Sequence, residues 1–255
     1  TRLSKRHGAT SIDQFRREGV LPQALCNYLS FLGWSPPEGK EVLTLEELVK
    51  LFDLSRVNRS AAIFDYEKLY WLNRQHIKLL PAQKKLELAL PYLQAAGLVG
   101  KDITSDEEQW LSQAVELLLE GVDKFSDLPQ KFSLIFDFKP ESLDEEAKDI
   151  ISSAAARQVL RAFVEKTSGL TDFNYDLFAR ITGEIKKETG IKGRDLYHPL
   201  RVMLTARASG LELDKFIPLI EDGAKLNFPR RIKSSLERIR EFARLMHLES
   251  ERQPV

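Results

Sequence analysis

Cysteine is nearly absent: the 255-residue chain has only Cys26, which excludes an intramolecular disulfide framework and a cysteine-based zinc cluster. A single cysteine fits a reducing, cytosolic setting. Because Cys26 follows Leu25 on an apolar helical face, we predict a buried structural thiol in preference to a reactive nucleophile.

Long hydrophobic runs are also missing. No uncharged apolar stretch approaches the roughly 18 residues that a membrane span needs, and the first residues lack the apolar region of a secretory signal. The chain opens without methionine on a cluster of basic residues, so we expect it to be a piece of a longer protein.

Complete catalytic and metal-binding motifs are absent as well. The four histidines, at positions 7, 76, 198 and 247, are far apart, and none has another at the spacing of metal ligands on a helix. The sequence contains no G-x-S-x-G elbow, no Walker loop and no Rossmann fingerprint. We therefore expect no metal site and identify no complete catalytic site.

Net charge is zero, but the charges are unevenly distributed. Residues 101–150 hold 5 Lys and Arg against 14 Asp and Glu, whereas residues 192–244 hold 12 against 7 and residues 1–20 hold 5 against 2. A polyanion would therefore meet two basic ends separated by an acidic middle. The alternative is that these charges are ordinary solvated helix faces.

Signals for helices dominate the sequence. The capping boxes Thr44–Glu47, Thr104–Glu107 and Ser142–Glu145 each precede a run of apolar residues at helical spacing. The second and third boxes lead into Trp110–Leu119 and Ile150–Phe163. These patterns predict helices that begin at the boxes.

Signals for strands are weak, since only Phe132–Phe138 shows a short and incomplete alternation. Gly97, Gly169 and Gly190 stand where helices are expected to end. We predict roughly ten helices and little or no sheet. In the last helix we expect an apolar stripe with three arginines outside it: Arg238, Arg240 and Arg244.

The opening segment Leu3–Gly8 places two adjacent cations, a small hydroxyl and a glycine before a helix-like segment. Such a loop can clamp a polyphosphate, because Lys5 and Arg6 neutralise phosphate charge and Gly8 lets the backbone approach. A disordered basic terminus is the alternative.

Three segments carry a family resemblance: Leu3–Ala9, Phe64–Asn73 and Pro199–Thr205. Together they resemble bacterial glutamyl-tRNA synthetase, a class I enzyme. The run Leu3–Ala9 is similar to the second class I signature, a mobile lysine loop, and Phe64–Asn73 resembles the stem-contact module behind it. Pro199–Thr205 is similar to the anticodon-binding C-terminal domain of the family. Residues 1–80 match densely and in order, and residues 80–190 match mainly in pattern.

The resemblance implies a mainly α, multi-domain helical array, with a stem-contact module followed by two all-helical anticodon-binding domains. We expect the lysine loop and stem-contact module at 1–78 and the two parts of the anticodon-binding region at 79–168 and 169–255. The chain would be the C-terminal half of the enzyme, because it lacks the Rossmann domain with its H-x-G-H-type motif and glutamate pocket. By itself it should not activate glutamate.

The resemblance also assigns site residues at two places. Lys5 would stabilise ATP phosphate and transition-state charge, and Ser4 and Arg6 would complete the ATP-binding loop. Anticodon-binding positions are expected at Gly121, His198, Arg201, Gly210 and Leu211.

Gly121 takes the place where members restricted to tRNA(Glu) carry an arginine against the third anticodon base. Losing the guanidinium removes a bidentate contact able to prefer one base, so the resemblance implies a relaxed enzyme that also charges tRNA(Gln). The alternative is that Gly121 only caps the preceding helix.

Arg201 lies in the Pro-Leu-Arg motif that the family uses at the anticodon, and its alternative role is that of an ordinary surface ion-pair partner. The tryptophans, Trp34, Trp71 and Trp110, are expected in the core and not as platforms for bases. Four further arginines are candidate phosphate contacts or ordinary solvated charges: Arg194, Arg207, Arg230 and Arg231.

The implied function is that of a cytoplasmic glutamate–tRNA ligase that uses ATP with Mg²⁺ in its full-length form, with no cofactor held by this portion alone. We expect a monomer whose partners are tRNA(Glu) and tRNA(Gln), and neither DNA nor a membrane. One alternative is a helical protein-interaction module, which the acidic stretch 101–150 favours. Another is a catalysis-deficient paralogue that keeps RNA binding.

Overall fold

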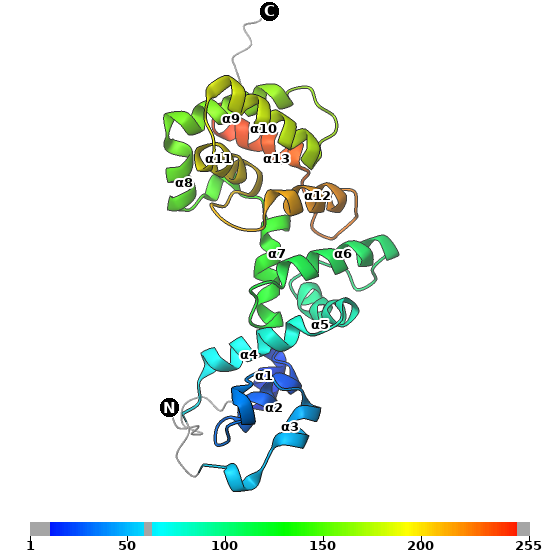
Figure 1. Ribbon diagram of the computed structural model, residues 1–255. Coiled ribbons are helices and arrows are strands. Elements are labelled where there is room, and N and C mark those ends of the chain that lie inside the picture. The colour runs from blue at the N-terminus through cyan, green and yellow to red at the C-terminus, as the bar shows by residue number, and fades with distance from the viewer. Residues whose placement is uncertain (1–10, 59–62, 249–255) are drawn as a thin grey trace, which may run out of the picture. The chain divides into compact units, whose positions relative to one another are not determined.

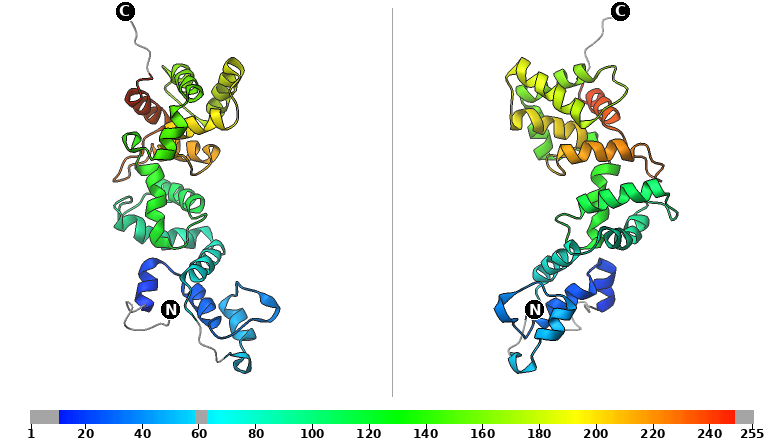
Figure 2. Two further views of the ribbon diagram at one scale, coloured as in Figure 1. Left: turned by 90° about the vertical axis from the view of Figure 1, so that its left-hand side faces the viewer. Right: turned by 45° about the vertical axis from the view of Figure 1, so that its right-hand side comes forward.

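The computed structural model describes residues 11–58 and 63–248. Within these ranges the chain forms thirteen α-helices and four short 3₁₀ helices, and no strand is present. Figure 1 and Figure 2 accordingly show helices joined by loops. The predicted mainly α fold is confirmed, and across these same ranges no helix has the length and hydropathy of a transmembrane segment.

Contacts divide the chain into two compact units. The N-terminal unit comprises the chain up to Ala96 together with Leu111–Pro129, and the C-terminal unit comprises Gly97–Trp110 and the chain from Gln130 onward. The three functional parts expected at 1–78, 79–168 and 169–255 are defined on a different basis and stay a prediction.

The N-terminal unit contains α1 to α5 and three 3₁₀ helices. Their bounds are α1 (Ile12–Glu18), α2 (Pro22–Ser30), η1 (Pro37–Gly39), α3 (Leu45–Leu51), η2 (Leu54–Arg56), α4 (Tyr66–Lys78), α5 (Ala82–Ala95) and η3 (Phe125–Asp127). Two helices have residues in both units: α6 (Ser105–Leu118) and α7 (Leu128–Phe136).

The core of the N-terminal unit lies mainly between α2 and α4, which pack against each other. Tyr28 and Leu72 are buried there, and a smaller cluster forms around Trp34. The prediction that Trp34 is a core residue is confirmed, and Trp71 packs half-buried against the main cluster.

Polar side chains are built into this core. The Asn27 amide oxygen accepts a hydrogen bond from the backbone N–H of Leu43 at 2.9 Å and lies 3.0 Å from Nε2 of His76. Since this oxygen is only an acceptor, Nε2 of His76 carries the proton. Burial lowers the pKa of His76, because the interior disfavours the imidazolium ion.

The C-terminal unit contains the remaining helices, η4 (Pro140–Ser142), α8 (Glu145–Ser152), α9 (Ala154–Thr167), α10 (Tyr175–Thr189), α11 (Arg194–Thr205), α12 (Leu213–Gly223) and α13 (Ser235–Leu245). Helix α11 packs against α8, α9 and α13. Trp110 is buried in this unit, as predicted, and its indole N–H donates to the backbone oxygen of Leu219 at 2.8 Å.

Arg238 on α13 is completely buried, so its predicted place on the outer face of the helix is wrong. Its guanidinium donates to the backbone oxygens of Leu204 at 3.0 Å, Leu134 at 3.3 Å and Ile135. Its Nε donates to the oxygen of Lys233 at 3.1 Å. These acceptors explain how a charged side chain can occupy a core position.

The position of Arg238 also suits its charge. The oxygens of Leu134, Ile135 and Leu204 lie at the C-terminal ends of α7 and α11, where helix dipoles favour a cation. The rings of Phe138 and Phe216 lie 5.0 Å and 5.3 Å from the guanidinium carbon. Burial lowers the pKa of Arg238 to about 9, so the group is still charged at neutral pH.

Helix boundaries confirm most of the predicted signals. The capping boxes of Thr44 and Thr104 form, with both hydrogen bonds in each. Gly97, Gly169 and Gly190 all follow helix ends with positive φ.

Two local expectations are wrong. Helix α8 is capped by Asp144, whose side chain accepts from the N–H of Ala147, while Ser142 lies in η4. Ser153 then starts a separate helix, α9, so Ile150–Phe163 is not one helix. The segment Phe132–Phe138, with its incomplete alternation, contains the end of α7 and no strand, which agrees with the prediction of little or no sheet.

The prediction that Cys26 is a buried thiol is also wrong, because this residue is exposed. The buried face of α2 consists of Ala24, Leu25, Asn27 and Tyr28. At about 100° per residue, Cys26 lies about 200° around the helix from Ala24, so it is on the opposite side from the buried face.

We predict that replacing Arg238 with Met destabilises the C-terminal unit by about 3 kcal/mol or more, because several buried helix-end oxygens lose their donor. Urea unfolding would measure this loss. The matched control is Arg240→Met, since Arg240 is exposed on the same helix and donates to a single backbone oxygen among the described residues, that of Leu170 at 2.8 Å. An equal loss in the two variants would contradict the role given to Arg238.

We also predict that His76 makes the N-terminal unit less stable in acid. Its folded-state pKa lies below the unfolded value, so the unfolded state takes up a proton first. The stability is complete above about pH 6.5 and falls as the pH drops below it toward the folded pKa. Urea unfolding at pH 7 and pH 5 measures how much unfolding free energy each variant loses between the two pH values. This loss should be smaller for His76→Gln than for the wild type. For the exposed His247→Gln it should equal that of the wild type.

Candidate nucleic-acid interface

The predicted ATP-binding loop with Ser4, Lys5 and Arg6 lies outside the described residues. The structure therefore leaves the assignment of Lys5 as a catalytic residue a prediction. The candidate positions for RNA contact lie within the described residues, in both units.

Gly121 belongs to the turn that follows α6 in the N-terminal unit. Its φ of +80° is in the left-handed region, and a Cβ atom added to it would meet no atom within 4 Å. The glycine thus fits the turn after the helix and also leaves open space above the backbone. Both interpretations of Gly121, as a turn residue and as an RNA-facing position, are compatible with this geometry.

The turn is fixed by its neighbours. Val122 is buried, and its N–H donates to the backbone oxygen of Leu119 at 3.0 Å. The backbone oxygen of Asp123 accepts from the side-chain amide of Asn73 at 2.7 Å. Gly121 itself is exposed.

Arg201 on α11 holds the loop that leads into α12. Its Nη1 donates to the backbone oxygen of Leu211 at 2.6 Å and of Gly210 at 3.4 Å, and its Nη2 lies 3.0 Å from a carboxylate oxygen of Glu212. Only 13% of its side chain is exposed, against 75% for Glu212. The guanidinium is therefore a clamp on the loop as well as a candidate RNA contact.

The structure brings Arg201, Gly210 and Leu211 together, as the sequence predicts. Gly210 is exposed with φ of +146°, and an added Cβ would touch Leu134 at 3.4 Å. His198 is half-buried one turn before Arg201 on α11. The assignment of all four residues to anticodon contact stays a prediction.

The four arginines considered as phosphate contacts are all exposed: Arg194, Arg207, Arg230 and Arg231. Two of them also form ion pairs, Arg230 with Asp137 and Arg231 with Glu237, each at 2.6 Å. Exposed pairs of this kind contribute little stability, so both arginines are available to exchange a carboxylate for a phosphate.

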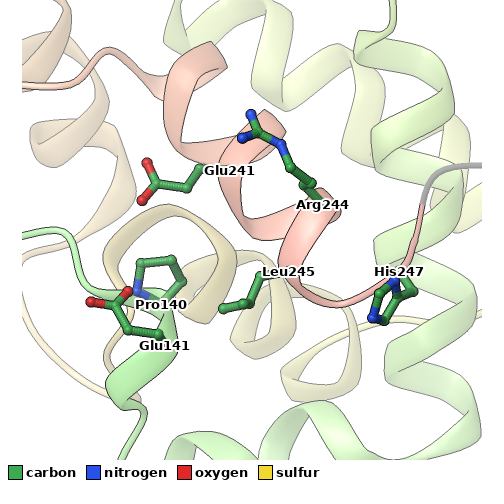
Figure 3. Close-up of a pocket in the computed structure, with 6 residues that line it drawn as sticks. All are labelled: Pro140, Glu141, Glu241, Arg244, Leu245 and His247. Carbon is green, nitrogen blue, oxygen red and sulfur yellow. The ribbon is translucent and has the colours of Figure 1, made fainter.

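A surface pocket of about 310 Å³ lies beside the end of α13 in the C-terminal unit (Figure 3). Its lining does not include any of the predicted site residues, and Glu241 within it is already paired with Lys233 at 2.5 Å. Six residues line it: Pro140, Glu141, Glu241, Arg244, Leu245 and His247. Across the described part of the chain, no group of three or more His, Cys, Asp or Glu side chains is arranged to hold a metal ion.

Two residues that shape these surfaces were not predicted from the sequence. Arg238 was assigned to the outer face of α13, and Asn73 was noted only as part of the stem-contact resemblance. Both residues share one sequence signal: each is a polar residue at a position where the helical spacing of its neighbours calls for an apolar one.

Comparison with known families agrees with this arrangement. The model of a family described as "Anticodon binding domain" matches residues 84–227, and that of "tRNA synthetases class I (E and Q), catalytic domain" matches residues 1–71. The chain belongs to the anticodon-binding domain family of the class I glutamyl-tRNA synthetases.

Similar proteins in this family are named as glutamate–tRNA ligases. Glutamate–tRNA ligase 1 of Caldicellulosiruptor saccharolyticus is 34% identical over 233 residues, which cover 91% of this chain and 47% of that protein. Glutamate–tRNA ligase of Bacillus subtilis is 35% identical over 221 residues, covering 86% and 46%. The chain thus spans about half the length of the curated relatives it matches.

A solved glutamate tRNA ligase from Elizabethkingia meningosepticum has the same fold over most of the chain. The TM-score is 0.70 at 24% sequence identity, and the match covers 90% of this chain and 42% of that structure. The helical array of this family is therefore confirmed as the fold.

We predict that Arg201→Met lowers the stability of the C-terminal unit by about 1–3 kcal/mol, because the oxygens of Gly210 and Leu211 lose a charged donor. Glu212→Gln should change it by less than about 0.5 kcal/mol, since that carboxylate is largely solvated. Thermal unfolding would compare the two variants. Similar losses in both would show that the ion pair, and not the clamp on the loop, accounts for the effect.

Proposed function

We propose that this chain is the tRNA-binding portion of a glutamate–tRNA ligase that works in the cytoplasm. The match of residues 84–227 to the anticodon-binding domain family carries this proposal. The match of residues 1–71 to the class I catalytic domain supports a second role, in which the chain supplies one part of the ATP site.

In this proposal the two ends of the chain contribute different steps. Lys5, with Ser4 and Arg6, neutralises charge on ATP, which is bound with Mg²⁺, and on the pyrophosphate that leaves. Anticodon contacts from Gly121 and from the loop clamped by Arg201 hold the tRNA. Binding at these distant positions orients the acceptor end for reaction, and this lowers the entropic part of the barrier.

We further propose that tRNA(Gln) is accepted together with tRNA(Glu). Gly121 is exposed and has no side chain, so a guanidinium able to select one base is missing at this position. Flexible single-stranded anticodon bases are read by hydrogen bonds to their edges, and the bare backbone at Gly121 excludes few of them.

The proposal is tested by fluorescence anisotropy with tRNA(Glu), tRNA(Gln) and an unrelated tRNA, at low and moderate salt. We expect salt-sensitive binding of the first two, weakened by anticodon changes, because phosphate contacts release counterions. Equal weak binding of all three would contradict the proposal. Weak tRNA binding that neither depends on salt nor prefers one tRNA would favour a protein-interaction module. The exposed apolar residues Val49, Leu54 and Ile63 are the observation that supports this alternative.

A single substitution tests the finer proposal. Gly121→Arg should weaken binding of tRNA(Gln) relative to tRNA(Glu) by about tenfold, which is the discrimination expected of one bidentate contact. Gly121→Gln is the matched control, because it has the same left-handed strain of about 1 kcal/mol without the guanidinium. If the ratio of the two affinities is equal in both variants, Gly121 is not the discriminating position.

A further inference from the structure

The turn that carries Gly121 is held mainly by residues of α1 and α4. Asn73 on α4 is completely buried and uses its whole side-chain amide. Its oxygen accepts from the N–H of Leu21 at 2.7 Å, and its nitrogen donates to the backbone oxygens of Gly19 at 3.3 Å and Asp123 at 2.7 Å. One side chain therefore joins the link between α1 and α2 to the turn after α6.

We call this connection between the α1–α2 link, α4 and residues 119–125 the joint. Charged groups strengthen it. Lys124 lies 3.5 Å from a carboxylate oxygen of Glu18 and 4.4 Å from the ring centre of Tyr70. The hydroxyl of Tyr70 donates to that carboxylate at 2.8 Å. Asp123 pairs with Arg74 at 3.3 Å. Both residues that follow Val122 in the turn are thus bound to α1 or α4.

Close backbone packing completes the joint. A Cβ atom at Gly19 would lie 2.6 Å from Cβ and 2.8 Å from the backbone nitrogen of Phe125, which is closer than real atoms approach. Phe125 is buried, and the ring of Tyr92 stacks on it at 6.3 Å between centres. Only glycine at position 19 lets α1 approach η3 this closely.

We propose that Asn73 is a positioning residue for tRNA recognition, which holds the backbone of the Gly121 turn in the geometry that meets the RNA. This inference rests on the proposed function of the chain. Because Gly121 has no side chain that can adjust, this position can contact RNA only through its main chain. Main-chain contacts tolerate little displacement, so they depend on the residues that hold the turn.

The consequence of removing Asn73 follows from its partners. The oxygens of Asp123 and Gly19 and the N–H of Leu21 would lose a buried hydrogen bond together. Gly121 is exposed and the space around its Cβ position is open, so this segment is the part expected to move.

The experiment compares Asn73→Ala with Asn27→Ala. Both asparagines are completely buried in the N-terminal unit, but Asn27 contacts Leu43 and His76 and has no hydrogen bond to the turn. Hydrogen exchange of the amides of residues 119–125 and anisotropy with tRNA(Glu) are measured for each variant. We expect Asn73→Ala to speed exchange in the turn and weaken tRNA binding about tenfold, and Asn27→Ala to do neither.

A second pair of variants reaches the joint without touching Asn73. Gly19→Ala and Gly39→Ala introduce the same Cβ at φ of +79° and +69°, but only the first meets other atoms within 4 Å. Gly19→Ala should reproduce both effects and Gly39→Ala neither. If Asn73→Ala does not fold, Arg74→Ala removes the ion pair to Asp123 at a partly exposed site and should weaken binding about threefold.

Faster exchange without a change in tRNA affinity would overturn the inference, because the position of the turn would then be irrelevant to RNA. Unchanged exchange in Asn73→Ala, or equal effects of Asn27→Ala, would overturn it as well. Failure of the wild-type chain to prefer tRNA(Glu) over an unrelated tRNA would overturn the proposed function and this inference together. Normal wild-type binding with unaffected variants would overturn the inference alone.

Discussion

The buried guanidinium of Arg238 is the interaction on which the C-terminal unit depends. Its hydrogen bonds to backbone oxygens at the ends of α7 and α11 offset the free energy of removing the charge from water. The backbone oxygen of Lys233, just before α13, accepts a further hydrogen bond. Helix ends are otherwise difficult to bury, since their last carbonyl groups have no partner within the helix. One side chain thus removes this obstacle for two helices and fixes where α13 lies against them.

The N-terminal unit solves the same problem with neutral amides. Asn27 and Asn73 are both completely buried, and each binds backbone groups of loops that regular helices cannot satisfy. The short helices α1 to α3 have few residues with which to build a core, so connections between them must be specified by polar contacts. In both units, side chains that bond to distant backbone also hold loops in place: Asn73 holds the turn of Gly121, and Arg201 holds the loop of Gly210 and Leu211.

Much of the fold could be predicted from local sequence signals. Capping boxes at Thr44 and Thr104 and apolar residues at helical spacing depend on neighbours in the chain, and these predictions are confirmed. Arg238 and Cys26 were misplaced because their burial depends on what packs against one helix face, and a single helix does not contain that information. For the candidate site, the motif around Arg201 identified the residue. Its hydrogen bonds to Gly210 and Leu211 could not be predicted, because they depend on how the loop nine and ten residues further along the chain folds back.

The left-handed backbone at Gly121 has a consequence for how the proposed anticodon specificity would change by mutation. A glycine codon becomes an arginine codon by a change of one base, and a Cβ atom added at the exposed Gly121 meets no other atom within 4 Å. The substitution costs only local strain of about 1 kcal/mol, a small part of the stability of a folded domain. Under the proposed function, recognition at this turn would therefore change in a single mutational step while the fold persists, and the reverse step would remove it.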